Sequence, residues 1–150
     1  MLGPMKVALG ADENTHLVGV IAGHLEKLGH SVRRFGAAAG EVEPWGETGA
    51  RVGESVARGE VEVGVVCCWT GTGVTIAANK VPGVRAALCG DAETARGARR
   101  WNDANVLALS LRSTSEQLAR EILDAWFAEP YGESESASLE AIARREPSDG

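Results

Sequence analysis

A thiol and a glycine-rich turn stand next to each other near the middle of the chain. Cys68 follows an apolar run over residues 61–67, and Thr70-Gly71-Thr72-Gly73 comes directly after Trp69. A cysteine thiol has an ordinary pKa of about 8.5, which falls near a helix N-terminus, so that the thiolate can act as a base or a nucleophile. Glycines allow a sharp turn that directs backbone N–H groups at an anion. These residues predict proton or nucleophilic chemistry on a substrate that develops negative charge.

Each part of this pattern also has an ordinary structural explanation. Free cysteine is among the most buried residue types, so Cys68 could be a small core side chain, and both interpretations stay open. Cys67 points to the other face of the pleat and is expected in the core, and burial is the better interpretation of Cys89. The glycine turn lacks the spacing of a dinucleotide site or a nucleotide P-loop, so no nucleotide cofactor is expected.

Two further polar segments are expected at the same sheet edge as Cys68. Asp12 and Glu13 follow the first strand and could supply a general acid or base, or Asp12 could simply cap the following helix. Residues 102–105 precede the last strand and are expected to reach this edge, although ordinary turn chemistry explains them equally well. The three histidines, His16, His24 and His30, are expected at the surface or partly packed, because their spacing matches no metal site.

The composition favours a small molecule as the partner. A net charge of -6 over 150 residues argues against nucleic acid or an anionic membrane, because those surfaces attract clustered Lys and Arg. Three cysteines, two of them adjacent, do not form a disulfide framework and indicate a reducing compartment. No apolar run reaches the roughly 18 to 20 residues of a membrane span, and the residues before Met5 are too few for a signal peptide. We therefore expect a cytoplasmic protein.

The apolar pattern predicts strands that alternate with helices. Strands are expected over residues 6–10, 31–35, 61–67, 84–88 and 105–109. Helices are expected over residues 16–28, 50–58, 74–79, 91–100 and 138–145, with a long helix after a capping box at 113–116. In residues 36–49 the apolar residues follow neither a helical nor a strand period, so this segment is expected to form a loop near the site. The apolar stripe of the long helix is expected in the core or in a subunit interface.

This alternation predicts an α/β fold with a three-layer, doubly wound parallel sheet of five strands, of the Rossmann-like or flavodoxin-like type. The right-handed crossover of each β-α-β unit makes the sheet parallel. Residues 1–150 are expected to form a single domain, with residues 128–150 as a C-terminal extension. Such a fold alone does not define a function.

Four segments together resemble the ribose-5-phosphate isomerase B and galactose-6-phosphate isomerase family. They are residues 10–12, 68–80, 83–86 and 102–108. The resemblance extends over nearly the whole chain, and the block Thr-Gly-x-Gly-x-x-Ile-Ala-Ala-Asn-Lys within residues 70–80 is highly specific. It implies a sugar-phosphate isomerase that converts an aldose to a ketose through a cis-enediol, without a metal or an organic cofactor.

The resemblance also implies roles for particular residues. Cys68 would be the base that moves a proton between C1 and C2, with Thr70 beside it among the catalytic residues and Asp12 or Glu13 assisting ring opening or binding. The amides of Gly71, Thr72 and Gly73 would hold the enediolate, which agrees with the chemistry of oriented N–H groups. The family shares its sites between the subunits of a homodimer, or of a tetramer, and Asn102 would contact the sugar hydroxyls.

The chain departs from the family pattern around this centre. Glu13 stands where the family usually has a histidine, and Trp101 replaces the histidine that assists ring opening, although a Trp side chain cannot take up a proton. Trp69 replaces a glycine. The family's Asp-Tyr-Pro segment is replaced in the region of residues 44–46. The added tryptophans suggest a pocket that stacks on an apolar sugar face.

The largest departure concerns the phosphate of the substrate. Residues 134–138 replace the Arg-His-x-x-Arg segment that grips the phosphate in the family, and Arg112 is the one phosphate-binding arginine that survives. The loss of cations weakens the attraction for a dianion. The default substrate is ribose 5-phosphate, or else a different or non-phosphorylated sugar. Two alternatives stay open: a non-catalytic carbohydrate-binding or regulatory protein, and a redox-sensing thiol.

Overall fold

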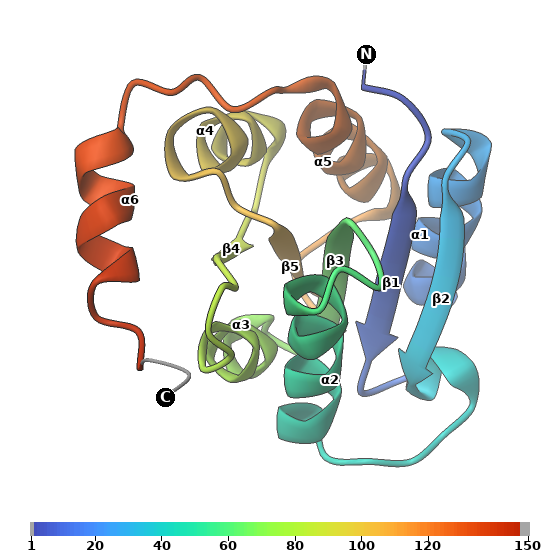
Figure 1. The fold of residues 1–150 in the computed structure, drawn as a ribbon. Helices are drawn as coiled ribbons and strands as arrows, with labels where there is room; N and C mark the ends of the chain where they lie inside the picture. Colours follow the sequence, from blue (N-terminus) through green and yellow to red (C-terminus); the bar gives the residue numbers. More distant parts are fainter. Residues whose placement is uncertain (1, 148–150) are drawn as a thin grey trace.

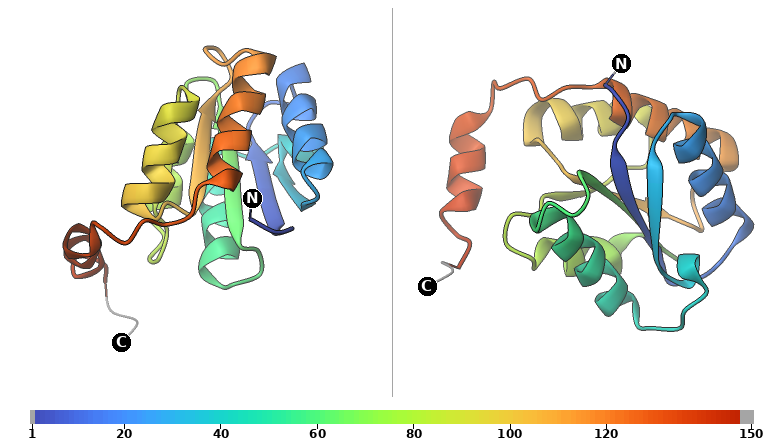
Figure 2. Two further views of the ribbon diagram at one scale, coloured as in Figure 1. Left: turned by 90° about the horizontal axis from the view of Figure 1, so that it is seen from above. Right: turned by 45° about the vertical axis from the view of Figure 1, so that its right-hand side comes forward.

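The fold is a parallel sheet with helices on both faces (Figures 1 and 2). It is described by a computed structural model over residues 2–147. The strands are β1 (Lys6–Ala11), β2 (Ser31–Gly36), β3 (Val63–Cys68), β4 (Ala86–Leu88) and β5 (Val106–Ser110). Their order across the sheet is β2-β1-β3-β5-β4, and every pair is parallel. The predicted five-stranded, doubly wound α/β fold is therefore confirmed.

The central strand β3 separates two buried layers. All six of its residues are buried, as a strand covered on both faces requires. Val65 and Cys67 join the cluster formed with α1 (His16–Lys27), α4 (Ala92–Asn102) and α5 (Glu116–Ala128). Val66 and Cys68 join the cluster formed with α2 (Trp45–Ala57) and α3 (Thr72–Asn79). The alternation along β3 thus directs the two adjacent cysteines to opposite faces, as predicted.

The segment expected to be a loop contains the first turn of α2 and a short 3-10 helix. Residues 37–39 form the 3-10 helix η1 (Ala37–Ala39), and α2 begins at Trp45 instead of residue 50. Pro44 caps the helix in an extended conformation, and its carbonyl accepts hydrogen bonds from the amides of Glu47 and Thr48. Glycines in the first turns hide the helical period. One of them, Gly49, is required by close packing, because a Cβ there would lie 2.9 Å from the Val74 carbonyl oxygen of α3.

The edge strand β4 is shorter than predicted. It begins at Ala86 instead of residue 84. The Asn79 side chain occupies the place of a neighbouring strand, since its amide donates to the Ala86 carbonyl at 3.0 Å and its oxygen accepts from the Ala86 amide at 2.8 Å. This side-chain pairing satisfies the backbone groups of the edge strand where no further strand is present.

The last long helix, α5, buries its apolar face in the hydrophobic core. Its cap is Ser115, whose hydroxyl accepts a hydrogen bond from the Leu118 amide at 3.1 Å, so the capping box predicted at residues 113–116 is wrong by two residues. Four residues of the predicted stripe are buried, namely Ile122, Leu123, Trp126 and Phe127. The stripe therefore lies in the core of the subunit and not in an interface.

The C-terminal helix α6 (Ser136–Ala143) stands apart from the rest of the fold (Figures 1 and 2). None of its residues is buried, and it begins and ends two residues earlier than predicted. Two hydrogen bonds tether its flanks: the Gly132 amide donates to the Arg100 carbonyl, and the Gly83 amide donates to the Glu146 carboxylate. The helix is therefore held at its two ends and not along its length.

The buried histidine His30 predicts a pH dependence of stability. Its Nδ1 accepts a hydrogen bond from the Met5 amide at 3.0 Å, its ring centre lies 4.2 Å from that of Phe127, and burial lowers the pKa of the imidazole. As the pH falls below the ordinary histidine value of 6.5, the unfolded chain binds a proton first, so the free energy of unfolding should fall until the folded pKa is passed. Above that ordinary value the contribution of His30 should be constant.

Urea unfolding of wild type and His30→Phe across this pH range checks the prediction. The variant should lose part of the wild-type slope, because phenylalanine cannot bind a proton. Val42→Ala is the control, since Val42 is fully exposed and carries no titratable group, and its slope should equal that of wild type. Equal slopes for wild type and His30→Phe would contradict this account of His30.

Candidate active site at the carboxyl edge of the sheet

The strand ends bring Cys68 and Asp12 to one edge of the sheet. Cys68 is the last residue of β3 and pairs in register with Ser110, the last residue of β5. On the other side, Ala11 pairs with Cys67, and the Asp12 amide donates to the Cys67 carbonyl at 3.3 Å. The predicted placement of Asp12 and Glu13 at the edge that holds Cys68 is confirmed. Ligands bind at this edge in open α/β sheets.

Hydrogen bonds from the end of β5 fix the loop after Cys68. The Trp69 carbonyl accepts from the Ser110 hydroxyl and from the Arg112 amide, both at 3.0 Å, and the Cys68 carbonyl accepts from the Leu111 amide at 3.0 Å. These contacts bring the backbone of Arg112 next to Trp69. Sequence reasoning missed Ser110. The one available signal was a hydroxyl at the end of an otherwise apolar strand.

Gly71 makes the turn that starts α3. Its φ of 79° lies in the left-handed region, and an added Cβ would lie 2.6 Å from Leu88 Cδ1 and 3.0 Å from the Leu109 carbonyl carbon. Only glycine satisfies both the conformation and the space. Because no side chain caps α3, its N-terminus presents backbone amides and a positive partial charge next to Cys68.

Two threonine hydroxyls line this turn. Thr70 Oγ1 and Thr72 Oγ1 lie 2.7 Å apart, and the Thr72 amide reaches Thr70 Oγ1 at 3.4 Å. Both residues are exposed, whereas Cys68 is only 5% exposed. The turn thus combines hydroxyl groups, backbone N–H groups and a largely sheltered thiol, a combination that suits a substrate carrying oxygen atoms and developing negative charge.

Asp12 carries an unsatisfied carboxylate. Among residues 2–147 its buried Oδ1 has no hydrogen-bond partner, and burial, together with the nearby charge of Glu13, raises the pKa of this carboxyl group. Asp12 does not cap α1, because the cap is Thr15, whose hydroxyl accepts from the Val18 amide at 3.4 Å. The capping interpretation is therefore wrong. A carboxylate without a structural partner is available to a ligand or a proton.

Replacement of Asp12 should separate stability from function. Asp12→Asn removes a charge that burial disfavours, so the free energy of unfolding at neutral pH should rise or stay unchanged, while ligand-dependent activity should fall. Urea unfolding and an activity assay on the same preparation check both effects. Asp91→Ala is a contrasting variant, since the Asp91 carboxylate caps α4 and accepts from the Thr94 amide at 2.7 Å, and the variant should lose stability. Loss of stability in Asp12→Asn would contradict this account.

Few free positive charges lie at this edge. Arg112 is exposed, and within residues 2–147 no carboxylate lies within 4 Å of its guanidinium group. Arg51, on α2, is held by Glu43 at 2.9 Å and by Glu41 at 3.7 Å, and the hydrogen bond to Glu43 raises the pKa of the arginine. Arg112 is thus the cation at this edge that is available to a ligand.

Trp101 and Asn102 lie at the opposite edge of the sheet. They end α4, and the chain then enters β5, where the Asn105 carbonyl accepts from the Gly64 amide at the start of β3. The expectation that residues 102–105 reach the edge of Cys68 is therefore wrong within one subunit. Residues that precede a parallel strand stand at its amino end, whereas Cys68 stands at a carboxyl end. Both Trp101 and Asn102 are exposed there.

The remaining candidate residues have structural partners. Cys89 is buried in the same cluster as Cys67, on the face of the sheet away from Cys68. His16 pairs with Glu116 at 2.9 Å and His24 with Asp124 at 2.7 Å. Over residues 2–147, no three His, Cys, Asp or Glu side chains are grouped as a metal site would require. In the same residues, no helix has the length and apolar character needed to cross a bilayer.

The fold is that of an α/β protein of the Rossmann-like class, and its carboxyl edge brings together a thiol, a carboxylate and a helix N-terminus as a candidate small-molecule site. Comparison with known proteins narrows the class. Residues 7–142 match the family described as Ribose/Galactose Isomerase. The chain therefore belongs to the ribose/galactose isomerase family, and it is an isomerase.

Individual relatives agree with this assignment. Ribose-5-phosphate isomerase B of Escherichia coli is 37% identical over 91% of this chain and 93% of its own length. D-erythrulose-4-phosphate isomerase of Pectobacterium atrosepticum is 34% identical over 92% of this chain and 93% of its own. The solved ribose-5-phosphate isomerase B of Clostridium thermocellum superposes with a TM-score of 0.88 at 39% identity, covering 93% of this chain and 96% of that one.

Proposed function

We propose that the protein interconverts an aldose and a ketose by proton transfer through a cis-enediol, with Cys68 as the base. The observation that carries the proposal is the position of Cys68, which is 5% exposed at the end of β3 and stands three residues before Gly71, the N-cap of α3. The N-terminus of a helix carries a positive partial charge, which suits the negative charge that develops on a substrate during proton transfer. Since the site provides its own base and its own amides, no cofactor is required by this chemistry.

The proposed reaction transfers a proton between two neighbouring carbons of the sugar. The Cys68 thiolate takes the proton from C2 of the open-chain aldose, and the electron pair of that bond forms the C1–C2 double bond of the enediol. Charge gathers on the carbonyl oxygen, where amides of the turn at Gly71 and Gly73 stabilise it. The proton of the C2 hydroxyl passes to the C1 oxygen as the carbonyl forms at C2, and the thiol delivers a proton to C1 after partial exchange with solvent. Thr70 would orient the sugar hydroxyls, and Asp12 or Glu13 would assist ring opening.

The substrate class follows from the relatives. Those named above act, by name, on ribose 5-phosphate and on D-erythrulose 4-phosphate. We take ribose 5-phosphate as the default substrate and keep other sugars, including non-phosphorylated ones, as alternatives. Carbon-13 NMR of the protein with a panel of aldoses and their phosphates should reveal conversion of at least one to its ketose. Failure of the entire panel would contradict the proposal.

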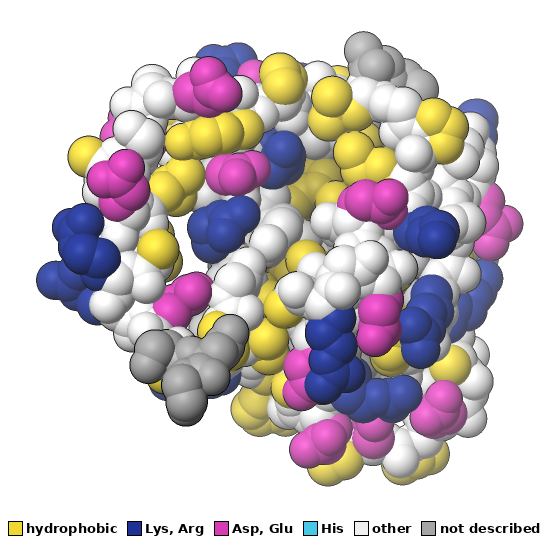
Figure 3. Space-filling model, viewed as in Figure 1, with side chains coloured by type: hydrophobic (Ala, Val, Ile, Leu, Met, Phe, Trp, Pro, Cys, Tyr) yellow, Lys and Arg dark blue, Asp and Glu magenta, His cyan; other side chains and the backbone are white. Residues whose placement is uncertain are grey.

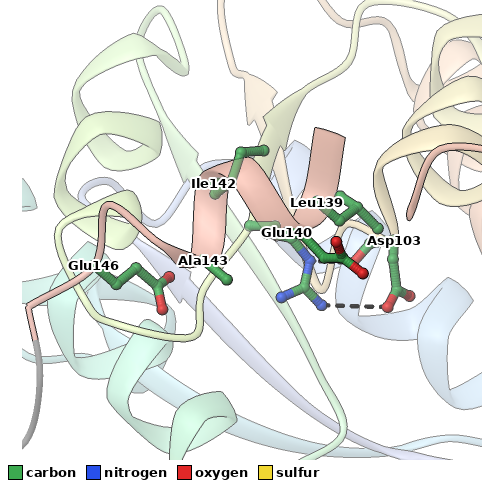
Figure 4. A pocket seen from close by; sticks show the side chains of 7 residues that line it. Asp103, Leu139, Glu140, Ile142, Ala143 and Glu146 are labelled. Carbon is green, nitrogen blue, oxygen red and sulfur yellow. Dashed lines mark hydrogen bonds and ion pairs between the residues drawn. The ribbon is translucent and has the colours of Figure 1, made fainter. Parts of the chain in front are cut away.

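A second copy of the chain would complete the site. Trp101 and Asn102 are exposed at the amino edge and can reach a carboxyl edge only in another subunit. The surface is hollowed beside α6, as Figure 3 shows. A cavity of about 280 Å³ lies there, lined by α6 and by the Arg85–Asp103 ion pair at 3.4 Å (Figure 4). We propose a homodimer, or a tetramer built from it, in which residues 128–150 act as an extension that takes part in assembly.

Mixing two inactive variants tests this arrangement. Cys68→Ala and Asn102→Ala should each have low activity alone. After the two are unfolded together and refolded, about a quarter of the wild-type activity should return, because half of the dimers are mixed and each holds one intact site. No recovery, with mixed dimers demonstrated by mass spectrometry, would contradict a shared site.

The alternative function is a carbohydrate-binding or regulatory protein on the same scaffold. Trp101 favours it, because this side chain cannot take up a proton at the position where the family has a histidine. Sugar binding without any conversion in the NMR panel would select this alternative. In either case we place the protein in the cytoplasm, on the support of its three free cysteines.

A further inference from the structure

Trp45 forms an aromatic wall at the candidate site. It is the first residue of α2, and its ring lies against the first turn of α3, since a Cβ at Gly73 would come within 2.9 Å of the ring atoms Cε3 and Cζ3. Gly73 therefore leaves room for the indole ring beside the amides proposed to hold the enediolate. The contact fixes one edge of the ring, yet Trp45 remains 49% exposed.

A second exposed tryptophan lies at the same edge. Trp69 follows Cys68 directly and is 55% exposed, while its backbone is fixed by Ser110 and Arg112. The exposed ring extends from a fixed backbone, because the carbonyl of Trp69 accepts two hydrogen bonds. Large aromatic side chains left exposed around a catalytic turn are typical of a binding surface for a ligand with an apolar face.

The charges around these rings disfavour a dianion. The acidic side chains that follow the strand ends include Asp12, Glu13 and Asp91, and Glu41 and Glu43 already hold Arg51. Within residues 2–147 of one subunit, Arg112 is the exposed arginine at this edge that has no carboxylate within 4 Å. A phosphate monoester carries about two negative charges at neutral pH. One exposed arginine among several carboxylates neutralises it poorly, whereas a neutral sugar meets no such penalty.

We propose that Trp45, together with Trp69, is a specificity-determining residue that stacks on the carbon-bearing face of the sugar and selects an unphosphorylated aldose over its phosphate ester. This inference rests on the proposed function, because it names the substrate class of the same site. The rings supply affinity through apolar contact, and the polar turn at residues 70–73 binds the hydroxyl edge of the same sugar. The preference for the unphosphorylated sugar therefore arises from apolar contact area and from charge, and not from side chains that bind a phosphate.

Paired substrates test the proposal. Wild-type kcat/KM is measured for ribose and ribose 5-phosphate, and for galactose and galactose 6-phosphate. In the pair that gives the higher kcat/KM, the value for the unphosphorylated sugar should exceed that for its phosphate ester by about tenfold or more. In Trp45→Leu, which keeps apolar bulk but loses the aromatic face, KM for that sugar should rise about tenfold while kcat changes less than about threefold. Trp69→Leu should change KM in the same direction. Preference for the phosphate ester, or an unchanged KM in both variants, would overturn the inference.

Controls separate this inference from the proposed function. Val42→Ala changes a fully exposed apolar residue in the loop before α2 and should leave both constants unchanged. Turnover with a preference for phosphate esters would overturn the role of the tryptophans and leave the isomerase in place. If no sugar turns over, the proposed function fails, and saturation-transfer NMR then tests the tryptophans alone: neutral sugars should bind wild type and lose binding in Trp45→Leu, and binding that survives in Trp45→Leu overturns the inference.

Discussion

Cys68→Ala should lower the rate of isomerisation by about 10²- to 10⁴-fold, which is the usual contribution of a positioned general base. The thiol is the group proposed to remove the substrate proton, and alanine cannot do so. KM should change little, because binding rests on the turn at Gly71 and on the tryptophans. The protein should remain folded, since Cys68 is a small side chain at the rim of a cluster whose other members are unchanged.

The adjacent cysteine provides the matched control. Cys67 has the same side chain one residue earlier, but it is fully buried on the opposite face of β3, and burial raises the pKa of its thiol to about 12. Cys67→Ala should keep kcat within about threefold of wild type, since removal of a remote core atom costs stability and not chemistry. Steady-state rates of Cys68→Ala and Cys67→Ala, measured side by side, test which cysteine is the base. Loss of activity in Cys67→Ala with retention in Cys68→Ala would contradict the assignment of the base.

Gly71→Ala should be nearly as damaging. The left-handed φ of 79° costs an alanine about 1–2 kcal/mol. The added Cβ would also approach the Leu109 backbone at 3.0 Å and Leu88 Cδ1 at 2.6 Å. Relief of these contacts must move the N-terminus of α3 and its amides. Because displacement of a single oxyanion donor costs about 10²- to 10³-fold in kcat, a loss of that size is expected.

Gly90→Ala is the control for this change. Gly90 follows β4 at the same edge, and an added Cβ there would meet no atom within 4 Å. Activity and unfolding midpoint should both stay close to wild type. Gly71→Ala should instead combine a lower unfolding midpoint with a lower kcat, measured by thermal denaturation and by steady-state kinetics. A fully active Gly71→Ala variant would show that the turn does not hold the developing charge.

The arrangement of the sheet could be predicted because its signals are local. The run that ends in Cys68 is apolar and β-branched, which marks a central strand, and the glycine turn after it marks the ligand edge. The placement of Asp12 followed from the same reasoning, since strand ends in a parallel sheet share an edge. These parts of the site are fixed by topology, which the order of strands and helices determines.

The remaining parts depend on contacts that a single sequence does not display. The start of α2 at Trp45 was missed because Gly46 and Gly49 break the apolar period, and the need for Gly49 becomes visible only when α3 packs against it. The direction of α4 was overlooked, so Asn102 was placed at the wrong edge. The ring of Trp45 against Gly73 is likewise a contact between two helices that are distant in sequence.

The central claim is that Cys68 moves a proton between C1 and C2 of a sugar. It is tested most directly by NMR of wild type and Cys68→Ala in deuterated water, following the proton at C2 of each aldose in the panel. We predict that wild type replaces this proton with deuterium while the ketose forms, and that Cys68→Ala does neither at a comparable rate. Formation of the ketose, or incorporation of deuterium, at the same rate in wild type and in Cys68→Ala would contradict the account.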